Sequence, residues 1–113
     1  MVKKGKYVPE KGDLVWLDFT PQAGHEQRGR RPALVLSPKE YNFKTGLGIF
    51  CPVTSKVKGY PFEVVIQSKK IDGVVLSDQI KSLDWTIRNA EFIEPVNKFS
   101  LKEVLQNIKL LVF

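Results

Sequence analysis

The sequence predicts a mainly β protein with a C-terminal helix, an α+β chain folded as a small, strongly bent sheet or barrel. Two observations support this class. Five or six short runs of branched and aromatic residues follow one another between turn signals, and one stretch with helical spacing ends the chain. A chain of 113 residues with 42% hydrophobic residues can bury one modest core. We therefore expect a single domain over residues 1–113.

Apolar runs bounded by turn residues mark the strands. In chain order, the expected strands cover residues 14–19, 32–37, 49–53, 62–66, 74–83 and 91–93. The first does not alternate cleanly, which indicates burial on both faces or a bend. On the fifth, Leu76, Asp78 and Ile80 would share one face, so that an acid would lie between two apolar side chains.

A short helix is expected over residues 38–43. Ser37 suits its N-cap, Pro38 its first position and Glu40 the acid of a capping box. This pattern predicts a helix between the second and third strands.

The terminal helix has the clearest signal. Ser100 and Glu103 form a capping box. Apolar residues with helical spacing follow, namely Leu101, Val104, Leu105, Ile108 and Leu111. Residues 110–113 are apolar almost all round, and they suit either core packing, which we favour, or a dimer interface.

Charge and cysteine content limit the partners and the compartment. The net charge of +6 and a pI near 9.5 favour an acidic partner, such as nucleic acid, an acidic protein segment or an anionic surface. The one cysteine, Cys51, lies in an apolar run and is expected to be a buried, inert thiol. No signal peptide or membrane-spanning run is present, so we expect a cytoplasmic protein with no membrane partner.

The first candidate site lies where a polar loop, residues 20–30, enters the second strand. Arg28, Arg30 and Arg31 stand at this junction. Arginine presents a planar fork of donors that matches a phosphate, and it stays charged at any working pH. The junction therefore suits an anionic substrate. The alternative is a solvated loop whose arginines only aid solubility.

The polar residues point to chemistry without a metal or cofactor. One histidine and one cysteine in different surroundings do not make a metal site, and no phosphate-binding glycine loop or nucleophile elbow is present. Cleavage of RNA by its own 2′-hydroxyl needs only a base, cations for the phosphorane and an acid. The candidate residues are His25, Glu26, Arg28, Arg30, Arg31, Thr54, Lys56, Asp78, Gln79 and Lys81.

Six motifs in order resemble the MazF/PemK toxin family. They are GDLVWLDF at 12–19, GHEQ at 24–27, GRRPALVLS at 29–37, PVTSK at 52–56, KGYPFEVV at 58–65 and GVVLSDQIKSLDW at 73–85. The resemblance covers nearly the whole chain. It implies an SH3-like barrel of the CcdB/PemK type, a homodimer, and a type II toxin that cleaves single-stranded RNA to a 2′,3′-cyclic phosphate without a metal. It also implies inhibition of translation and growth, and a cognate antitoxin with an acidic flexible tail.

The two branches of the family place their catalytic groups differently. In the MazF-like branch the key pair matches Arg31 and Thr54. In the PemK-like branch the loop histidine and the aspartate of the Asp-Gln pair match His25 and Asp78. That branch also uses an arginine two residues before the aspartate, where this chain has Leu76. The KGYPF segment also resembles the MazF-like branch.

The chemistry of these side chains limits their roles. Arg31 stays protonated, so it suits stabilisation of the phosphorane better than proton removal. Thr54 can only donate or accept a hydrogen bond. Asp78 and Glu26 are therefore the candidates for the general base, because a carboxylate near apolar residues can hold a proton near neutral pH. The alternative for Asp78 is a carboxylate that caps backbone N–H groups in the barrel.

Structural alternatives also exist for the other residues. His25 is either catalytic or a loop residue that contacts RNA or nothing, and Arg31 could pair with a barrel carboxylate. Phe19 suits the core better than a base-stacking platform, although it lies at a strand end. The expected RNA-binding residues are Phe19, Gln27, Arg28, Arg30, Lys56, Lys58, Gln79 and Lys81.

Two other functions fit the same barrel. One is a non-enzymatic toxin that binds DNA gyrase through the end of its C-terminal helix, as the related CcdB fold does. The other is an RNA-binding barrel without activity, which would bind RNA without turnover.

Overall fold

The computed structural model describes residues 6–19 and 29–113, and it confirms a mainly β fold with a C-terminal helix. The strands are β1 (Asp13–Phe19), β2 (Gly29–Val35), β3 (Leu47–Thr54), β4 (Glu63–Val65), β5 (Val74–Leu76), β6 (Lys81–Asp84) and β7 (Glu91–Pro95). The helices are α1 (Lys39–Thr45), the 3-10 helix η1 (Trp85–Ile87) and α2 (Lys98–Val112).

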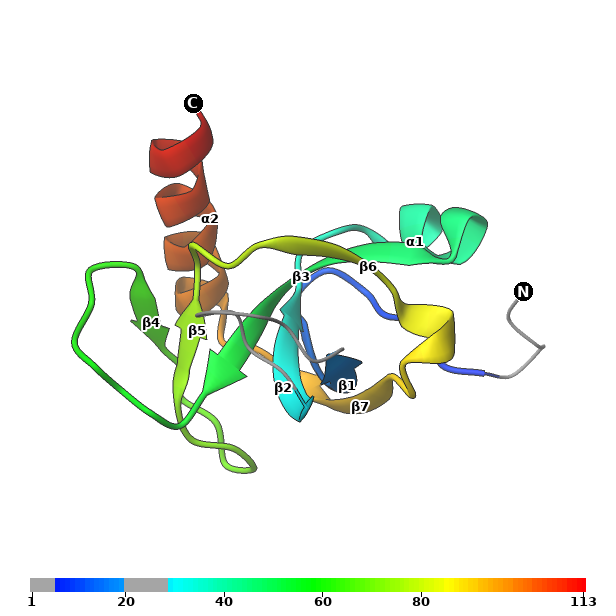
Figure 1. The fold of residues 1–113 in the computed structure, drawn as a ribbon, viewed down its shortest axis with the longest axis horizontal. Helices are drawn as coiled ribbons and strands as arrows, with labels where there is room; N and C mark the ends of the chain where they lie inside the picture. The colour runs from blue at the N-terminus through cyan, green and yellow to red at the C-terminus, as the bar shows by residue number, and fades with distance from the viewer. Residues whose placement is uncertain (1–5, 20–28) are drawn as a thin grey trace.

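All strand pairings are antiparallel, in the order β4-β5-β3-β2-β1-β7, with β6 also paired to β3. The long strand β3 organises this sheet. It pairs with β2 along one side, and on the other side with β6 near its start and with β5 at its end. This change of partner bends the sheet, and α2 stands beside β4 and β5 at one end of the molecule (Figure 1).

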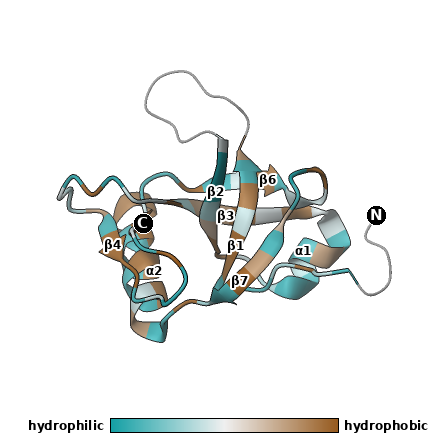
Figure 2. Ribbon diagram, turned by 90° about the horizontal axis from the view of Figure 1, so that it is seen from below, coloured by the Kyte–Doolittle hydropathy of each residue, from teal (hydrophilic) through white to brown (hydrophobic). Residues whose placement is uncertain are grey.

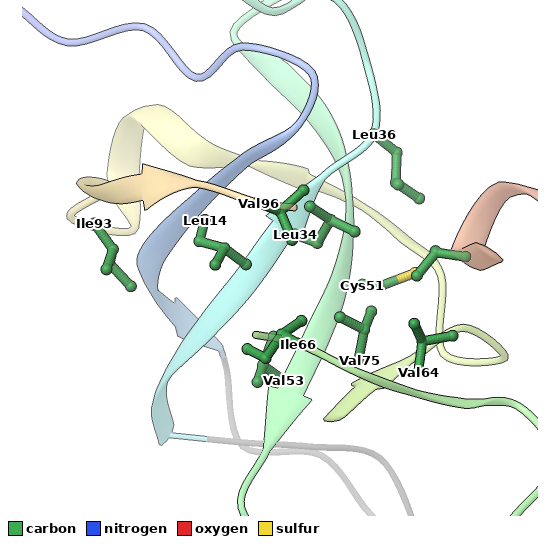
Figure 3. Close-up of a cluster of buried hydrophobic side chains, with 11 residues drawn as sticks. Leu14, Leu34, Leu36, Cys51, Val53, Val64, Ile66, Val75, Ile93 and Val96 are labelled. Atoms are coloured by element: carbon green, nitrogen blue, oxygen red, sulfur yellow. The ribbon is translucent and has the colours of Figure 1, made fainter. Parts of the chain in front are cut away.

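The central sheet is buried on both faces, which confirms the expectation from the irregular first strand. Leu14 belongs to one cluster of buried side chains, whereas Val15 and Leu17 belong to a second cluster that includes Trp85. Figure 3 shows part of the first cluster, which also contains Cys51. Because successive side chains of a strand point to opposite faces, a strand between two clusters is apolar almost throughout.

The expected long strand over residues 74–83 is wrong. The strand β5 ends at Leu76, a turn follows in which the N–H of Gln79 donates to the carbonyl of Leu76 at 3.1 Å, and β6 begins at Lys81. The side chain of Asp78 is exposed, and Ile80 is 42% exposed. The two short strands pair with different parts of β3, so the chain must turn between them.

The first helix exists, but its expected capping box is wrong. The N-cap of α1 is Pro38, and no side chain caps it. Ser37 is buried instead. Its hydroxyl donates to Oδ1 of Asn42 at 2.5 Å and accepts a hydrogen bond from the N–H of Ile49 at 2.8 Å. The serine therefore ties α1 to β3 rather than starting the helix.

Asn42 completes a buried polar cluster, which we call the Asn42 cluster (Pro9, Ser37, Asn42, Trp85). Its Nδ2 donates to the carbonyls of Pro9 at 2.8 Å and Ser37 at 3.0 Å. Nε1 of Trp85 donates to the carbonyl of Asn42 at 3.1 Å. These bonds join α1, η1 and the segment before β1.

The terminal helix begins earlier than predicted. Asn97 is its N-cap and accepts a hydrogen bond from the N–H of Phe99 at 2.8 Å. Ser100 lies inside the helix, where its hydroxyl donates to the carbonyl of Val65 at 3.0 Å. The predicted apolar spacing is confirmed for Val104, which is buried, and for Leu101, Leu105 and Ile108, which pack on the first cluster, but not for Leu111, which is 48% exposed.

The prediction that the end of α2 packs into the core is wrong. Leu110 is 78% exposed and Phe113 is 94% exposed, and the two residues between them are also exposed. This helix end projects from the body in Figure 1.

Candidate functional site

The candidate site lies at the end of the sheet where β2 begins and β3 ends. The register pairs Ala33 with Pro52. The pairing of β2 with β3 ends there, and its register, extended by two residues along each strand, directs Arg31 toward Thr54, which pairs with Val74 on its other side. Figure 2 shows the start of β2 as strongly hydrophilic, whereas the middle of β1 is hydrophobic. Arg31 and Thr54, which are distant in sequence, thus lie at neighbouring strand ends, and we call this part of the sheet the strand-end edge.

Arg31 and Thr54 also share one face of the sheet. Arg31 pairs with Leu17 on β1, and the alternation of side chains places it on the face of Ala33. Thr54 lies on the same face as Pro52 by the same rule. The residues of β2 become more buried along the strand, and Arg31, near its start, is half-buried. A partly buried cation can interact with a phosphate more strongly than a fully solvated one.

The backbone around Thr54 is tightly constrained. Its side chain is only 5% exposed, and its Oγ1 accepts a hydrogen bond from the N–H of Lys56 at 3.1 Å. A hydroxyl that accepts one bond retains its hydrogen for donation. Gly73 has φ +142°, and a Cβ there would lie 2.3 Å from the carbonyl oxygen of Thr54. Only glycine fits this approach, so the residue before β5 lies directly against the backbone of the threonine.

Arg30 has different surroundings from Arg31. Its Nη1 contacts Oδ1 of Asp18 at 2.9 Å, and its Nη2 contacts Oε1 of Glu91 at 3.0 Å. Side-chain hydrogen bonds from Asn89 and Arg30 lower the pKa of Asp18 below its usual value. Arg30, which the sequence predicts to bind RNA, is thus held by two carboxylates from β1 and β7. Arg30 and Arg31 point to opposite faces because they are consecutive in a strand.

The residues after β5 lie differently from the sequence expectation. Asp78 is in the turn that follows β5, where its charge helps to raise the pKa of the Cys51 thiol, after the larger effect of burial, to about 12. Asp78 is exposed and does not lie between apolar side chains of one strand face, so this prediction is wrong. Gln79 and Lys81 are half-buried, and Lys81 pairs with Phe50 on β3. Cys51 itself is fully buried, as predicted.

The remaining candidates divide into three groups. Lys56 and Lys58 are exposed on the loop after β3. Phe19 is 4% exposed in the second cluster, so little of its ring is available for stacking on a base. Four candidates, His25, Glu26, Gln27 and Arg28, lie outside the described residues.

Sequence reasoning missed the carboxylates that hold Arg30. Asp18 and Arg30 are cross-strand partners, and opposite charges at such positions stabilise antiparallel pairs. Knowledge of the β1–β2 register would have revealed this pair. Glu91 comes from a strand that is distant in sequence, and the local sequence pattern does not predict its contact with Arg30.

Two negative findings concern only residues 6–19 and 29–113. Within them, the histidine, cysteine and carboxylate side chains form no group of three or more that could hold a metal ion. No helix in the same ranges is both long enough and apolar enough to cross a membrane.

The fold and this edge define a small, bent β-sheet protein with cationic and hydroxyl side chains at one strand end. Residues 10–112 match the family of PemK-like, MazF-like toxins of type II toxin–antitoxin systems, and the chain belongs to this family. The resemblance seen in the six sequence motifs is therefore confirmed.

Relatives with known names support this assignment. The chain is 55% identical over 85 residues to the endoribonuclease toxin MazF of Escherichia coli (strain K12), which covers 75% of this chain and 77% of that protein. It is 33% identical over 118 aligned residues to the endoribonuclease toxin ChpB of the same strain, with 99% of each covered.

Solved structures show the same fold. MazF from Deinococcus radiodurans matches with a TM-score of 0.90 at 56% identity, over 95% of this chain and 98% of that one. A MazE–MazF complex from the same organism matches with a TM-score of 0.85 at 56% identity, over 95% and 97% of the two chains.

Proposed function

We propose that this chain is the toxin of a type II toxin–antitoxin pair and a sequence-specific endoribonuclease of single-stranded mRNA that inhibits translation and growth. Residues 1–113 would form one toxin domain. The observation that carries the proposal is the strand-end edge shared by Arg31 and Thr54. Relatives that match over most of the chain are named endoribonuclease toxins, which supports the same activity here.

In the proposed reaction, the 2′-hydroxyl oxygen of one nucleotide attacks its neighbouring phosphorus atom. A 2′-O–P bond forms, the P–O5′ bond breaks, and the products are a 2′,3′-cyclic phosphate and a 5′-hydroxyl. Arg31 would stabilise the charge of the phosphorane, and the Thr54 hydroxyl would donate a hydrogen bond to a phosphate oxygen. No step in this scheme requires a metal ion.

The general base is proposed to be Glu26 first and Asp78 second. Asp78 follows β5 on the side away from Val74, the residue that pairs with Thr54. Its charge acts on Cys51, which precedes Thr54 by three residues of an extended strand, or roughly 10 Å. This separation argues against Asp78, so Glu26 is the candidate to test first. His25 remains a candidate for the acid that protonates the leaving 5′-oxygen.

The proposed RNA site also predicts its partner. We propose that the acidic tail of a cognate antitoxin competes with RNA for the cationic side chains at this edge. The net charge of +6 and the similarity to a solved MazE–MazF complex support this partner. Because the substrate is mRNA, the proposed place of action is the cytoplasm.

The exposed end of α2 supports a homodimer. An apolar end is formed by Leu110, Leu111, Val112 and Phe113, which the described part of the chain leaves largely exposed. Exposed apolar patches of this kind mark protein interfaces. The same surface would serve the rival function of gyrase binding.

One assay separates these functions. Purified protein is incubated with a long single-stranded RNA in EDTA, and the cleavage sites and product ends are mapped. We expect cuts within a short sequence motif and 2′,3′-cyclic phosphate ends. Plain 3′-hydroxyl ends would exclude attack by the 2′-hydroxyl. Intact RNA together with gyrase inhibition would favour the rival toxin, and binding without cleavage would favour the inactive barrel.

The base is tested by pH–rate profiles of two matched variants. If Glu26 accepts the proton, Glu26→Gln should remove the acidic limb of the profile and nearly all activity. Asp78→Asn should retain the limb. The reverse result would make Asp78 the base.

A further inference from the structure

The loop between β3 and β4, residues 55–62, begins directly after Thr54 and curves away from the body of the sheet (Figure 1). We call it the β3–β4 loop. All of its residues are exposed except Phe62, which is half-buried. From Thr54 to Tyr60 the chain can span at most about 20 Å. An RNA strand bound at the strand-end edge would therefore reach this loop within a few nucleotides.

The loop has a defined shape despite its exposure. The carboxylate of Glu63 accepts hydrogen bonds from the N–H of Lys58 at 3.1 Å and from the N–H of Gly59 at 2.9 Å. The N–H of Glu63 in turn donates to the carbonyl of Tyr60 at 3.1 Å. Gly59 has φ +79°, a backbone conformation that glycine adopts without strain. The turn that carries Tyr60 is thus held from both sides.

The loop presents an aromatic ring beside positive charge. Tyr60 is 61% exposed, and Nζ of Lys58 lies over its ring at 5.8 Å from the centroid. A cation over one face of the ring leaves the other face for a planar ligand. The carboxylate of Glu63 is occupied with backbone N–H groups of this loop, and the charged side chains within the loop itself are Lys56 and Lys58.

We infer that Tyr60 is a specificity-determining residue that stacks on one nucleobase of the RNA, a few nucleotides from the scissile phosphate. An exposed aromatic ring among cations is the arrangement that binds single-stranded nucleic acid, because the base stacks and the phosphate is neutralised. Lys58 binds the adjacent phosphate, and Glu63 is a positioning residue that fixes the turn. This inference rests on the proposed function and extends its site beyond the catalytic edge.

The test measures binding rather than cleavage. The probe is an RNA that contains the mapped cleavage motif and a 2′-deoxynucleotide at the scissile position, which prevents the reaction. Its dissociation constant is compared for the wild type, Tyr60→Ala and Tyr60→Phe. We expect Tyr60→Ala to weaken binding about tenfold or more, and Tyr60→Phe to bind within about twofold of the wild type, because the ring is retained. Phe43→Ala, which removes a 57% exposed ring from α1, is the matched control and should have no effect.

Abasic substitution then locates the stacked base. Removing one base at a time from the probe should weaken wild-type binding at a particular flanking position, and the same substitution should cause no further loss in Tyr60→Ala. Equal binding by wild type and Tyr60→Ala, or equal losses in both at every abasic position, would overturn this inference but would leave the proposed function intact. A changed oligomeric state of Tyr60→Ala in light scattering would also overturn it, since the ring would then belong to an interface between copies. Failure of the wild type to bind any RNA would contradict the proposed function as well as this inference.

Glu63→Gln distinguishes positioning from direct contact. If Glu63 only fixes the turn, this variant should bind the intact probe more weakly, and the abasic substitution opposite Tyr60 should then have a smaller effect than in the wild type. An unchanged pattern of abasic losses would show that the turn does not depend on the carboxylate.

Discussion

The two ends of β2 carry polar residues with opposite surroundings. At its start, Arg30 is exposed and Arg31 is half-buried. Just beyond its end, Ser37 and Asn42 are buried, and their side chains are hydrogen-bonded to each other and to the backbone. The strand β2 thus has the candidate site at its start and the hydrogen-bonded Asn42 cluster beyond its end. Exposure distinguishes the two arginines from the structural cluster, whereas Thr54, at 5% exposed, is as buried as Ser37.

The sharpest test of this contrast is Arg31→Ala. We expect the cleavage rate to fall by about 10³-fold, or about 4 kcal/mol of transition-state stabilisation, because a cation is lost where phosphorane charge develops. The melting temperature should change little. The control is Arg30→Ala, which should cleave within about fivefold of the wild type, since Arg30 is bound to Asp18 and Glu91. Equal losses in both variants would contradict the distinction between the two arginines.

The opposite behaviour is expected at the other end of the strand. Asn42→Ala should lower the free energy of unfolding by about 3 kcal/mol, because two buried carbonyls and the Ser37 hydroxyl lose their partner. Urea unfolding measures this change. The folded fraction should cleave RNA at the wild-type rate, and a loss of activity in fully folded protein would place Asn42 in the site after all.

Gly73 connects stability to the site, so its variant should affect both. We expect Gly73→Ala to lower the free energy of unfolding by about 2 kcal/mol, through the positive φ and the close approach to Thr54. The displaced threonine should also reduce cleavage by folded protein. Gly59→Ala, at a positive φ with open space around it, is the matched control and should affect stability less. Equal effects of the two would show that the contact with Thr54 is unimportant.

The smallest effect is expected at Asp18. Hydrogen bonds from Asn89 and Arg30 lower the pKa of its carboxyl group in the folded state. Its contribution to stability is therefore present above the unfolded value, about 3.9, and is lost as the pH falls below it. The drop in melting temperature between pH 7 and pH 3 should be slightly smaller in Asp18→Asn than in the wild type. A larger drop in Asp18→Asn would contradict the assignment.

Most of the fold could be predicted from local patterns. The branched and aromatic runs marked the strands, and the apolar spacing after residue 100 marked the face of α2 that packs on the core. The errors came from tertiary information. Residues 74–83 continue to alternate through a turn, and only the change of partner along β3 shows that two strands are present. Ser100 matches a capping box, but the helix starts at Asn97, another good capping residue.

The arrangement of the candidate site could be predicted in part, while the roles of its residues stay predictions. Arg31 and Thr54 were selected by their chemistry and by the family resemblance, but their placement on one edge depends on the register between β2 and β3. The engagement of Arg30 by two carboxylates also depends on pairing between strands. Asp78 was misplaced because the alternation rule was applied beyond the end of its strand.

The position of β3 in the sheet has a consequence for how the protein can be inhibited. This strand pairs with β2, β5 and β6, so its amide hydrogens should exchange with solvent only on global unfolding. Thr54 forms the end of this strand and cannot easily move without disturbing its partners. An inhibitor of the proposed site would therefore act by covering this strand end from outside rather than by displacing the threonine, and the strand would stay as slow to exchange as in the uninhibited protein.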